Sequence, residues 1–321
     1  MSPGTAPSHP APAAESAWSL ALAASGMAES LDAGNRDRAF GLDDRGGLKA
    51  LTSESPDTIL AWRRGRGWEL GLPADDPRFD VLSLYLPICS ATAARPVTVG
   101  HLGQSLDGFI ATHSGDSQFV TGPENLVHMH WLRALCDAVV VGAGTVAADD
   151  PQLTTRHVPG PHPLRVIFDP SRRLAPTFRL FTDGTAPTLY ICERTHVAPG
   201  ETQVGGAPIV GVDGEGPGGA MGAVLRLLRA RGCPRVFVEG GGVTVSAFLE
   251  ANLLDRLHIA IAPVIIGDGR PAIRLSAPAR LSECLRPGYR VFRMGGDVLF
   301  DCDLRAACQP PQPSSQVSRV I

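Results

Sequence analysis

The chain has 321 residues, of which 44% are hydrophobic and 19% are charged, as in an ordinary globular protein that is long enough for one large domain or two smaller ones. Its formal net charge of −3 provides no global positive field for nucleic acid or anionic lipid, so we expect neither as a partner. No uncharged apolar run reaches the about 18 residues that a membrane helix needs, and no membrane span is expected.

The first part of the chain gives weak signals. Residues 1–16 are rich in proline and alanine, which predicts a disordered tail without the features of a secretory signal. The pattern of residues 17–31 is compatible with a helix, whereas residues 32–75 show little periodicity, and the apolar run Phe79–Cys89 is compatible with a strand. We therefore interpret residues 17–94 as an accessory N-terminal region whose role the sequence does not state.

The pattern changes at Arg95-Pro96, where alternating strands and helices begin. Strands are predicted at 97–101, 138–141, 164–168, 188–192, 208–212, 235–239 and 256–266. Helices are predicted at 123–135, with Thr121 as a candidate N-cap, at 219–231 and at 243–252. Gly295-Gly296-Asp297 predicts a hairpin between 289–294 and 298–303. This order predicts an α/β fold with a mainly parallel central sheet, helices on both faces and an antiparallel C-terminal hairpin, which leaves residues 305–321 as a tail.

The clearest candidate site is the strand 235–239, which runs into Gly240-Gly241-Gly242 and then into a predicted helix. Glycines let a ligand approach the backbone closely, and the N–H groups at a helix start suit a phosphate. A tight strand-to-helix turn without a ligand is the alternative. The pattern differs from G-x-G-x-x-G and lies late in the chain, so it gives poor support to a Rossmann fold.

A second strand ends in Gly142-Ala143-Gly144, and Thr145, Asp149 and Asp150 follow it. Paired carboxylates can serve acid–base chemistry, although a capped loop explains the same residues equally well. No metal site is expected: no pair of the seven cysteines forms a C-x-x-C motif, and His128 and His130 do not share a helix face. The scattered cysteines are simplest to interpret as reduced thiols of a cytoplasmic enzyme.

Together these segments resemble the C-terminal reductase domain of the bifunctional riboflavin biosynthesis protein, the RibD C-terminal family. Order and approximate spacing agree over roughly residues 95–304. The matching stretches are L-G-Q-S-L-D-G at 102–108, S-G-D-S at 114–117, V-T-G at 120–122, L-R-A at 132–134, V-G-A-G-T-V-A-A-D-D-P-Q-L-T-T-R at 141–156, V-E-G-G-G at 238–242 and A-P-V-I-I-G-D-G-R-P at 262–271.

The resemblance implies a dihydrofolate-reductase-like fold for residues 95–304, with NADPH as hydride donor and NADH not excluded. It implies a phosphorylated heterocycle as the small-molecule partner, namely a phosphoribosylamino-pyrimidine whose opened ribosyl group is reduced to a ribityl chain. It also implies a homodimer, in which the apolar segment Ile259–Ile266 either helps to cover the interface or forms an internal strand.

The resemblance further assigns site residues by their positions in the matching motifs. Residues expected to contact the cofactor are Gly103, Phe119, Thr145, Asp149, Pro170, Ser171, Arg173, Gly240, Gly241, Gly242, Val243 and Thr244. Residues expected to contact the substrate are Ser117, Arg133, Leu153, Arg156 and Glu239. Asp149 and Glu239 are the candidate catalytic residues, and Arg133 and Arg156 are charged forks that suit a ribose phosphate.

Some positions depart from the family pattern. Phe119 stands where the family often has tryptophan, and Pro170 stands where the family tends to have serine, in the loop expected near the 2′-phosphate of NADPH; Arg172 or Arg173 could restore that contact. Residues 1–94 contain neither H-x-E nor P-C-x-x-C, so zinc-dependent deamination is not expected there. Two alternatives stay open: reduction of a pterin or a related heterocycle on the same fold, and a non-catalytic module that binds the cofactor.

Overall fold

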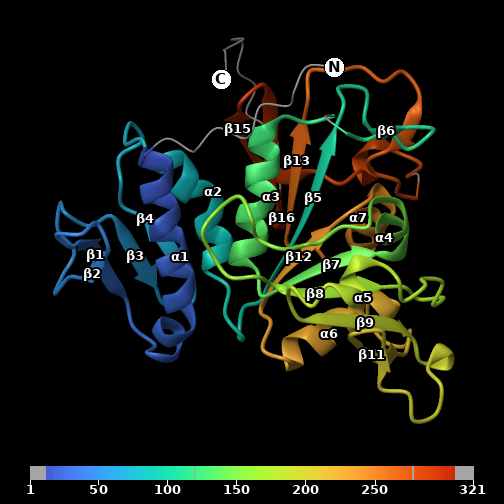
Figure 1. Cartoon of the computed structure of the whole chain (residues 1–321). Coiled ribbons are helices and arrows are strands. Elements are labelled where there is room, and N and C mark those ends of the chain that lie inside the picture. The colour runs from blue at the N-terminus through green and yellow to red at the C-terminus, as the bar shows by residue number, and fades with distance from the viewer. Residues whose placement is uncertain (1–11, 119, 277, 308–321) are drawn as a thin grey trace. The chain divides into compact units, whose positions relative to one another are not determined.

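The computed structural model describes residues 12–307, apart from residues 119 and 277, and divides the chain between Val97 and Thr98 into two compact units (Figure 1). Among the described residues, no helix combines the length and hydropathy that crossing a membrane requires. The first helix begins at Pro12, inside the segment predicted to be a disordered tail, and the last strand continues to Ala307, beyond the predicted boundary at 304.

The first unit contains a four-stranded antiparallel sheet with the strand order β2-β1-β3-β4 and two helices that pack together. Its elements are α1 (Pro12–Ala33), β1 (Arg38–Leu42), β2 (Leu48–Ala50), β3 (Leu60–Arg63), β4 (Gly67–Leu70) and α2 (Phe79–Cys89). The strand predicted at Phe79–Cys89 is wrong, because this segment is helical. Leu82, Tyr85 and Cys89 are buried at helical spacing, and the Tyr85 ring meets Trp18 of α1 edge-on at 6.0 Å.

The second unit is built on a ten-stranded sheet with the order β10-β11-β9-β8-β7-β12-β5-β13-β16-β15. Its strands are β5 (Val97–Gln104), β7 (Ala138–Gly142), β8 (Leu164–Phe168), β9 (Thr188–Glu193), β10 (Gln203–Val204), β11 (Ala207–Val212), β12 (Arg235–Glu239), β13 (Arg256–Ile261), β15 (Pro287–Met294) and β16 (Asp297–Ala307). Its helices are α3 (Pro123–Leu135), α4 (Ala143–Asp149), α5 (Arg179–Thr182), α6 (Gly219–Ala230) and α7 (Gly242–Glu250), with short 3₁₀ turns at Arg194–His196 and Leu281–Glu283. A separate pair consists of β6 (Phe109–Thr112) and β14 (Gly269–Pro271).

The predicted fold class is confirmed. Strands β11, β9, β8, β7 and β12 pair in parallel, β13 pairs in parallel with β5, and β16 and β15 add the antiparallel hairpin. Helices cover both faces of the sheet. Val238 packs in one core cluster with Leu228 of α6 and Phe248 of α7, whereas Tyr190 meets Phe181 of α5 edge-on from the other face.

The strand order creates a switch point beside β12. From β5 the chain passes over one position to β7 and continues outward through β8 and β9, and it later returns to place β12 between β7 and β5. Ligands of open parallel sheets bind in the crevice at the carboxyl ends of the strands, where the direction of winding reverses. The glycine turn that follows β12 lies at this point.

Two local predictions are wrong. Gly122 caps α3 instead of Thr121, whose hydroxyl oxygen accepts a hydrogen bond from the Asn125 amide at 2.9 Å. The strand predicted at 256–266 ends at Ile261, because the following loop is held by Asp107, whose carboxylate accepts the backbone N–H of Gly267 at 2.6 Å. The strand itself is internal, since it pairs with β5 on one side and β16 on the other.

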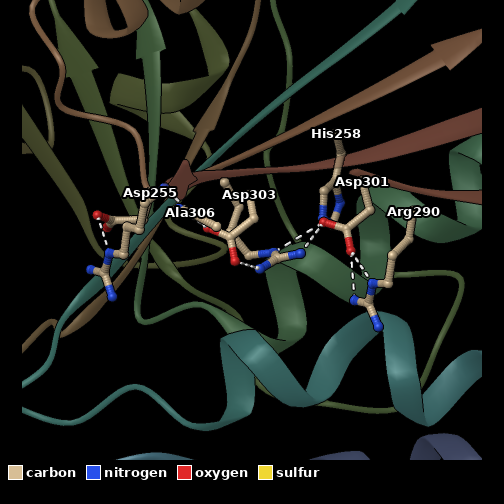
Figure 2. A network of polar contacts seen from close by, with 8 residues as sticks. Asp255, His258, Arg290, Asp301, Asp303 and Ala306 are labelled. Atoms are coloured by element: carbon tan, nitrogen blue, oxygen red, sulfur yellow. Dashed lines mark hydrogen bonds and ion pairs between the residues drawn. The ribbon is translucent and has the colours of Figure 1, made fainter. Parts of the chain in front are cut away.

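A buried carboxylate connects three neighbouring strands, β13, β16 and β15, at one edge of the large sheet. Asp301 of β16 is fully buried, and one of its oxygens accepts a hydrogen bond from Arg256 Nε at 3.0 Å. Its other oxygen accepts a bond from Arg290 Nη2 at 2.6 Å, and Figure 2 shows His258 and Arg290 on either side of it. Although burial raises the pKa of Asp301, the contacts with His258 and Arg256 lower it by more, so the carboxylate stays charged.

Next to this carboxylate, three imidazole rings lie in a row inside the protein. His258 Nδ1 is 3.1 Å from His128 Nε2, and the ring centroids of His128 and His101 are 5.2 Å apart. Burial lowers the pKa of all three histidines, to about 3 for His101. The row is therefore neutral in the folded protein at neutral pH.

We predict that the second unit loses stability as the pH falls from about 7 towards 4. Below the ordinary histidine pKa of about 6.5 the unfolded chain takes up protons that the folded chain does not, and each such histidine removes about 1.4 kcal/mol per pH unit. The measurement is the free energy of unfolding in urea at several pH values. The free energy of unfolding should fall less steeply with decreasing pH in His128→Gln. It should fall as in the wild type in His113→Gln, whose side chain is 71% exposed. Equal slopes in the two variants would contradict the prediction.

Candidate active site

A cavity of about 900 Å³ opens at the carboxyl ends of four central strands. Its lining includes Gly103 at the end of β5, Gly142 of β7, Phe168 of β8 and Glu239 of β12. This is the crevice that the switch in strand order predicts, and its volume lies in the usual range for small-molecule sites.

The glycine turn after β12 forms one wall of this cavity. Gly240 has a φ of +145°, which only glycine adopts readily, and the Gly241 N–H donates a hydrogen bond to the Thr145 hydroxyl at 3.0 Å. At Gly242 a Cβ atom would lie 2.1 Å from the Ala272 carbonyl oxygen. Close packing within the protein therefore requires a glycine at position 242. Gly242 also lines the cavity, together with Gly240, Gly241, Val243 and Thr244.

The second wall is the short helix α4. Gly144 has open space where a Cβ would stand, and Thr145 and Asp149 line the cavity on the same helix. Burial raises the pKa of Asp149, and the positive charge of Arg270 opposes that shift. The neighbouring Asp150 has a φ of +40°, and its carboxylate accepts the backbone N–H of Arg179 at 2.7 Å. Of these two adjacent aspartates, Asp149 therefore lines the cavity, whereas Asp150 stabilises a loop.

Glu239 is fixed by a buried ion pair with Arg133 of α3. Arg133 Nε donates to one carboxylate oxygen at 2.7 Å, and Nη2 donates to the other. The remaining terminal nitrogen donates to the Thr154 carbonyl oxygen at 3.2 Å. Both side chains of the pair are less than a tenth exposed, but only Glu239 lines the cavity. Arg133 therefore holds a protein carboxylate in this structure instead of facing the cavity.

The other residues predicted to contact substrate lie at different depths. Ser117 lines the cavity on the loop after β6. Leu153 is buried, with a φ of +53°, outside the lining. Arg156 is exposed, and its guanidinium donates to the Thr154 hydroxyl at 2.7 Å while its backbone N–H donates to His130 Nδ1 at 2.9 Å.

Two residues of the loop after β8 line the cavity, Pro170 and Arg173, whereas the predicted Ser171 is not part of the lining. Arg172 cannot substitute for Arg173, because its guanidinium is held by Glu201 at 2.6 Å. Arg173 keeps 69% of its side chain exposed and lies 3.6 Å from Asp169. The prediction for Phe119 falls outside the described residues.

Several lining residues had no predicted role. Arg270 and Arg274 bring positive charge from the segment that includes β14. His101 lies 2.8 Å from the Asn125 amide oxygen, and Asn125 bonds in turn to Thr121, so these three form a polar chain along the wall. Arg270 belongs to the G-D-G-R-P motif, but sequence alone does not show that this motif reaches the cavity. The described residues contain no cluster suited to a metal ion.

Comparison with known proteins places this site in a family. Residues 97–285 match the model of the RibD C-terminal domain. The 2,5-diamino-6-ribosylamino-4(3H)-pyrimidinone 5′-phosphate reductase of Methanothermobacter thermautotrophicus is 32% identical over 220 residues, which cover 64% of this chain and 97% of that protein. The reductase of the same name from Archaeoglobus fulgidus is 36% identical over 185 residues, 54% of this chain and 83% of that protein.

Larger relatives match over part of their length. The chain covers 49% of the riboflavin biosynthesis protein RibD of Aquifex aeolicus, and the two are 32% identical over 179 residues, or 56% of this chain. Among solved structures, a deaminase and 5-amino-6-(5-phosphoribosylamino)uracil reductase from Thermotoga maritima aligns with a TM-score of 0.55 at 27% identity, over 70% of this chain and 59% of that one. The chain thus spans about half the length of RibD relatives of this kind.

The ion pair leads to a test of stability. Arg133→Met should lower the free energy of unfolding by about 3–5 kcal/mol, because it leaves Glu239 buried without its partner. The double variant Arg133→Met with Glu239→Leu should recover a large part of that loss, since no unpaired charge remains. Urea unfolding of the wild type, both single variants and the double variant gives the coupling energy. If the losses of the single variants simply add in the double variant, the two side chains are not coupled as the contacts indicate.

Proposed function

The chain belongs to the RibD C-terminal domain family, and on this premise we propose that it is a nicotinamide-dependent reductase of a phosphoribosylamino-pyrimidine in riboflavin biosynthesis. The observation that carries the proposal is the cavity at the switch point, whose lining combines Glu239, held in place by Arg133, with Asp149 and Thr145 in the part of the chain that matches the family. The substrate class comes from the names of the two archaeal relatives.

The cavity has the charge distribution that a dinucleotide cofactor requires. Its lining contributes the guanidinium groups of Arg173, Arg270 and Arg274 against two carboxylates, Asp149 and Glu239. Arg133 compensates Glu239, and Asp169 partly compensates Arg173 from 3.6 Å, which leaves Arg270 and Arg274 against Asp149. The excess positive charge suits a ligand with several phosphates. When bound, the reduced nicotinamide would supply the hydride. We propose NADPH because Arg173 lies in the loop after β8, at the position expected for the 2′-phosphate.

Different side chains of the cavity are assigned to the substrate and to the cofactor. Glu239 has both oxygens oriented by Arg133, and we assign it to the hydroxyl or amino groups of the substrate. Asp149 has a pKa raised by burial, so its carboxyl group holds a proton more readily than an exposed aspartate and can hydrogen-bond to the reacting groups. Thr145 positions the turn at Gly241 through its hydroxyl. The homodimer and the cytoplasmic location remain predictions, and sedimentation velocity would test the dimer.

The function is tested by following NADPH absorbance with the purified chain and two substrates, 2,5-diamino-6-ribosylamino-4(3H)-pyrimidinone 5′-phosphate and 5-amino-6-(5-phosphoribosylamino)uracil. We expect turnover of at least one of them. Asp149→Asn should lower kcat about a hundredfold. Asp150→Asn is the matched control, because it changes the neighbouring carboxylate, which lies outside the cavity lining, and should leave kcat near the wild-type value. Tight NADPH binding with no turnover of either substrate would support a binding module and refute the reductase.

The assignment of the 2′-phosphate gives a separate prediction. Arg173→Ala should raise the KM for NADPH about tenfold and leave the KM for NADH unchanged, since only NADPH carries the additional phosphate. Initial rates with each cofactor measure both constants. Arg172→Ala provides a control, because that guanidinium is already held by Glu201. An equal rise in the KM for NADPH and for NADH would show that Arg173 does not recognise the 2′-phosphate.

A further inference from the structure

Two arginines of the cavity, Arg270 and Arg274, have no ion-pair partner among the described residues and no assigned ligand group. Arg270 is the middle residue of β14, and Arg274 follows that strand on the same segment. Both are exposed and line the cavity. Within the part of the chain that the structure describes, neither guanidinium forms a hydrogen bond or an ion pair, whereas Arg133, Arg165 and Arg256 are each bound to a carboxylate. Two guanidinium groups without a carboxylate partner that line one cavity favour the binding of an anion there.

The backbone between the two arginines lies against the glycine turn. A Cβ at Gly242 would be 2.7 Å from the Pro271 carbonyl oxygen and 2.1 Å from the Ala272 carbonyl oxygen. The next contact along the segment is the Arg274 N–H, which donates to the Ser246 hydroxyl of α7 at 2.8 Å. Arg270 and Arg274 therefore flank, along the chain, the short stretch of backbone that packs against the start of α7.

The loop after β6 leaves room for the first of these side chains. Gly115 has a φ of +96°, and a Cβ there would lie 2.8 Å from Arg270 Nη2. The guanidinium thus lies against bare backbone, between this loop and the cavity. Its charge also acts on Asp149 of the same cavity, where it opposes the rise in pKa that burial causes.

From this geometry we propose that Arg270 and Arg274 form a clamp for a phosphate-bearing ligand, and that the group they bind is the diphosphate of the nicotinamide cofactor. The two guanidinium forks, carried by the segment that packs against Gly242, match in number and charge the two phosphates of a diphosphate. The substrate phosphate is the other source of the same chemistry, because Ser117 lies on the loop that Arg270 touches. This inference rests on the proposed cofactor but not on the proposed substrate.

The test measures binding and needs no turnover. NADPH is titrated by its fluorescence into the wild type, Arg270→Gln, Arg274→Gln, the double variant and the control Arg293→Gln, an exposed arginine of β15 outside the cavity lining. We expect each cavity variant to weaken NADPH binding about tenfold and the double variant about a hundredfold, with the control unchanged. Salt should weaken binding less in the double variant than in the wild type. Arg270→Lys should recover part of the affinity, since it keeps the charge and loses the fork.

Parallel titrations with ribose 5-phosphate and inorganic pyrophosphate identify the source of the phosphate. Competition of pyrophosphate with NADPH should be lost in the double variant, while the affinity for ribose 5-phosphate stays constant. Loss of ribose 5-phosphate binding with NADPH binding intact would overturn the proposal and assign the arginines to the substrate. The proposal would also be overturned if the cavity variants bound NADPH as tightly as Arg293→Gln does, or if the wild type bound no NADPH. A wild type that binds NADPH through these arginines but reduces neither pyrimidine would leave the clamp intact and refute the proposed function alone.

Discussion

The buried ion pair between Arg133 and Glu239 is the constraint on which the site depends. It joins α3 to the last residue of β12 across 106 residues of sequence, immediately before the glycine turn. Removing both charges from water is costly, and that cost is offset only because both oxygens and the third guanidinium nitrogen have partners. One turn earlier on α3, His130 accepts the backbone N–H of Arg156. A single helix face thus fixes both the carboxylate and the loop 153–156.

Three of the four glycines compared at the cavity are required by packing within the protein itself. An added Cβ would collide with Thr121 at Gly103, with the Thr244 hydroxyl at Gly142 and with the Ala272 carbonyl at Gly242. Gly144 alone of the four has open space at that position. The capacity to bind a ligand therefore comes from the strand order, which opens the crevice, and from the charges around it. A count of glycines in the sequence measures mainly how closely the walls are packed.

The sequence was most informative where long apolar runs alternate, which is why the strands and helices of the large sheet could be predicted. It failed at Phe79–Cys89, where a run that is apolar on most positions does not reveal its period, and at β6 and β14, which exist only because each pairs with the other. The same limit applies to the site. A charged fork at Arg133 and a carboxylate at Glu239 were both identified, but that each is the other's partner depends on tertiary structure. The free guanidinium of Arg270 is likewise visible only once its neighbours are known.

The position of the cavity also weighs on the choice of substrate. A pterin or a related heterocycle was considered because the N-terminal region differs from the pattern of the bifunctional relatives and could have reshaped the pocket. The family match begins at residue 97, the boundary between the compact units falls after the same residue, and the described residues that line the cavity belong to the second unit. The walls are therefore formed by the part of the chain that is shared with the pyrimidine reductases. This shared lining supports a phosphorylated pyrimidine, the substrate class named for the archaeal relatives, as the proposed substrate.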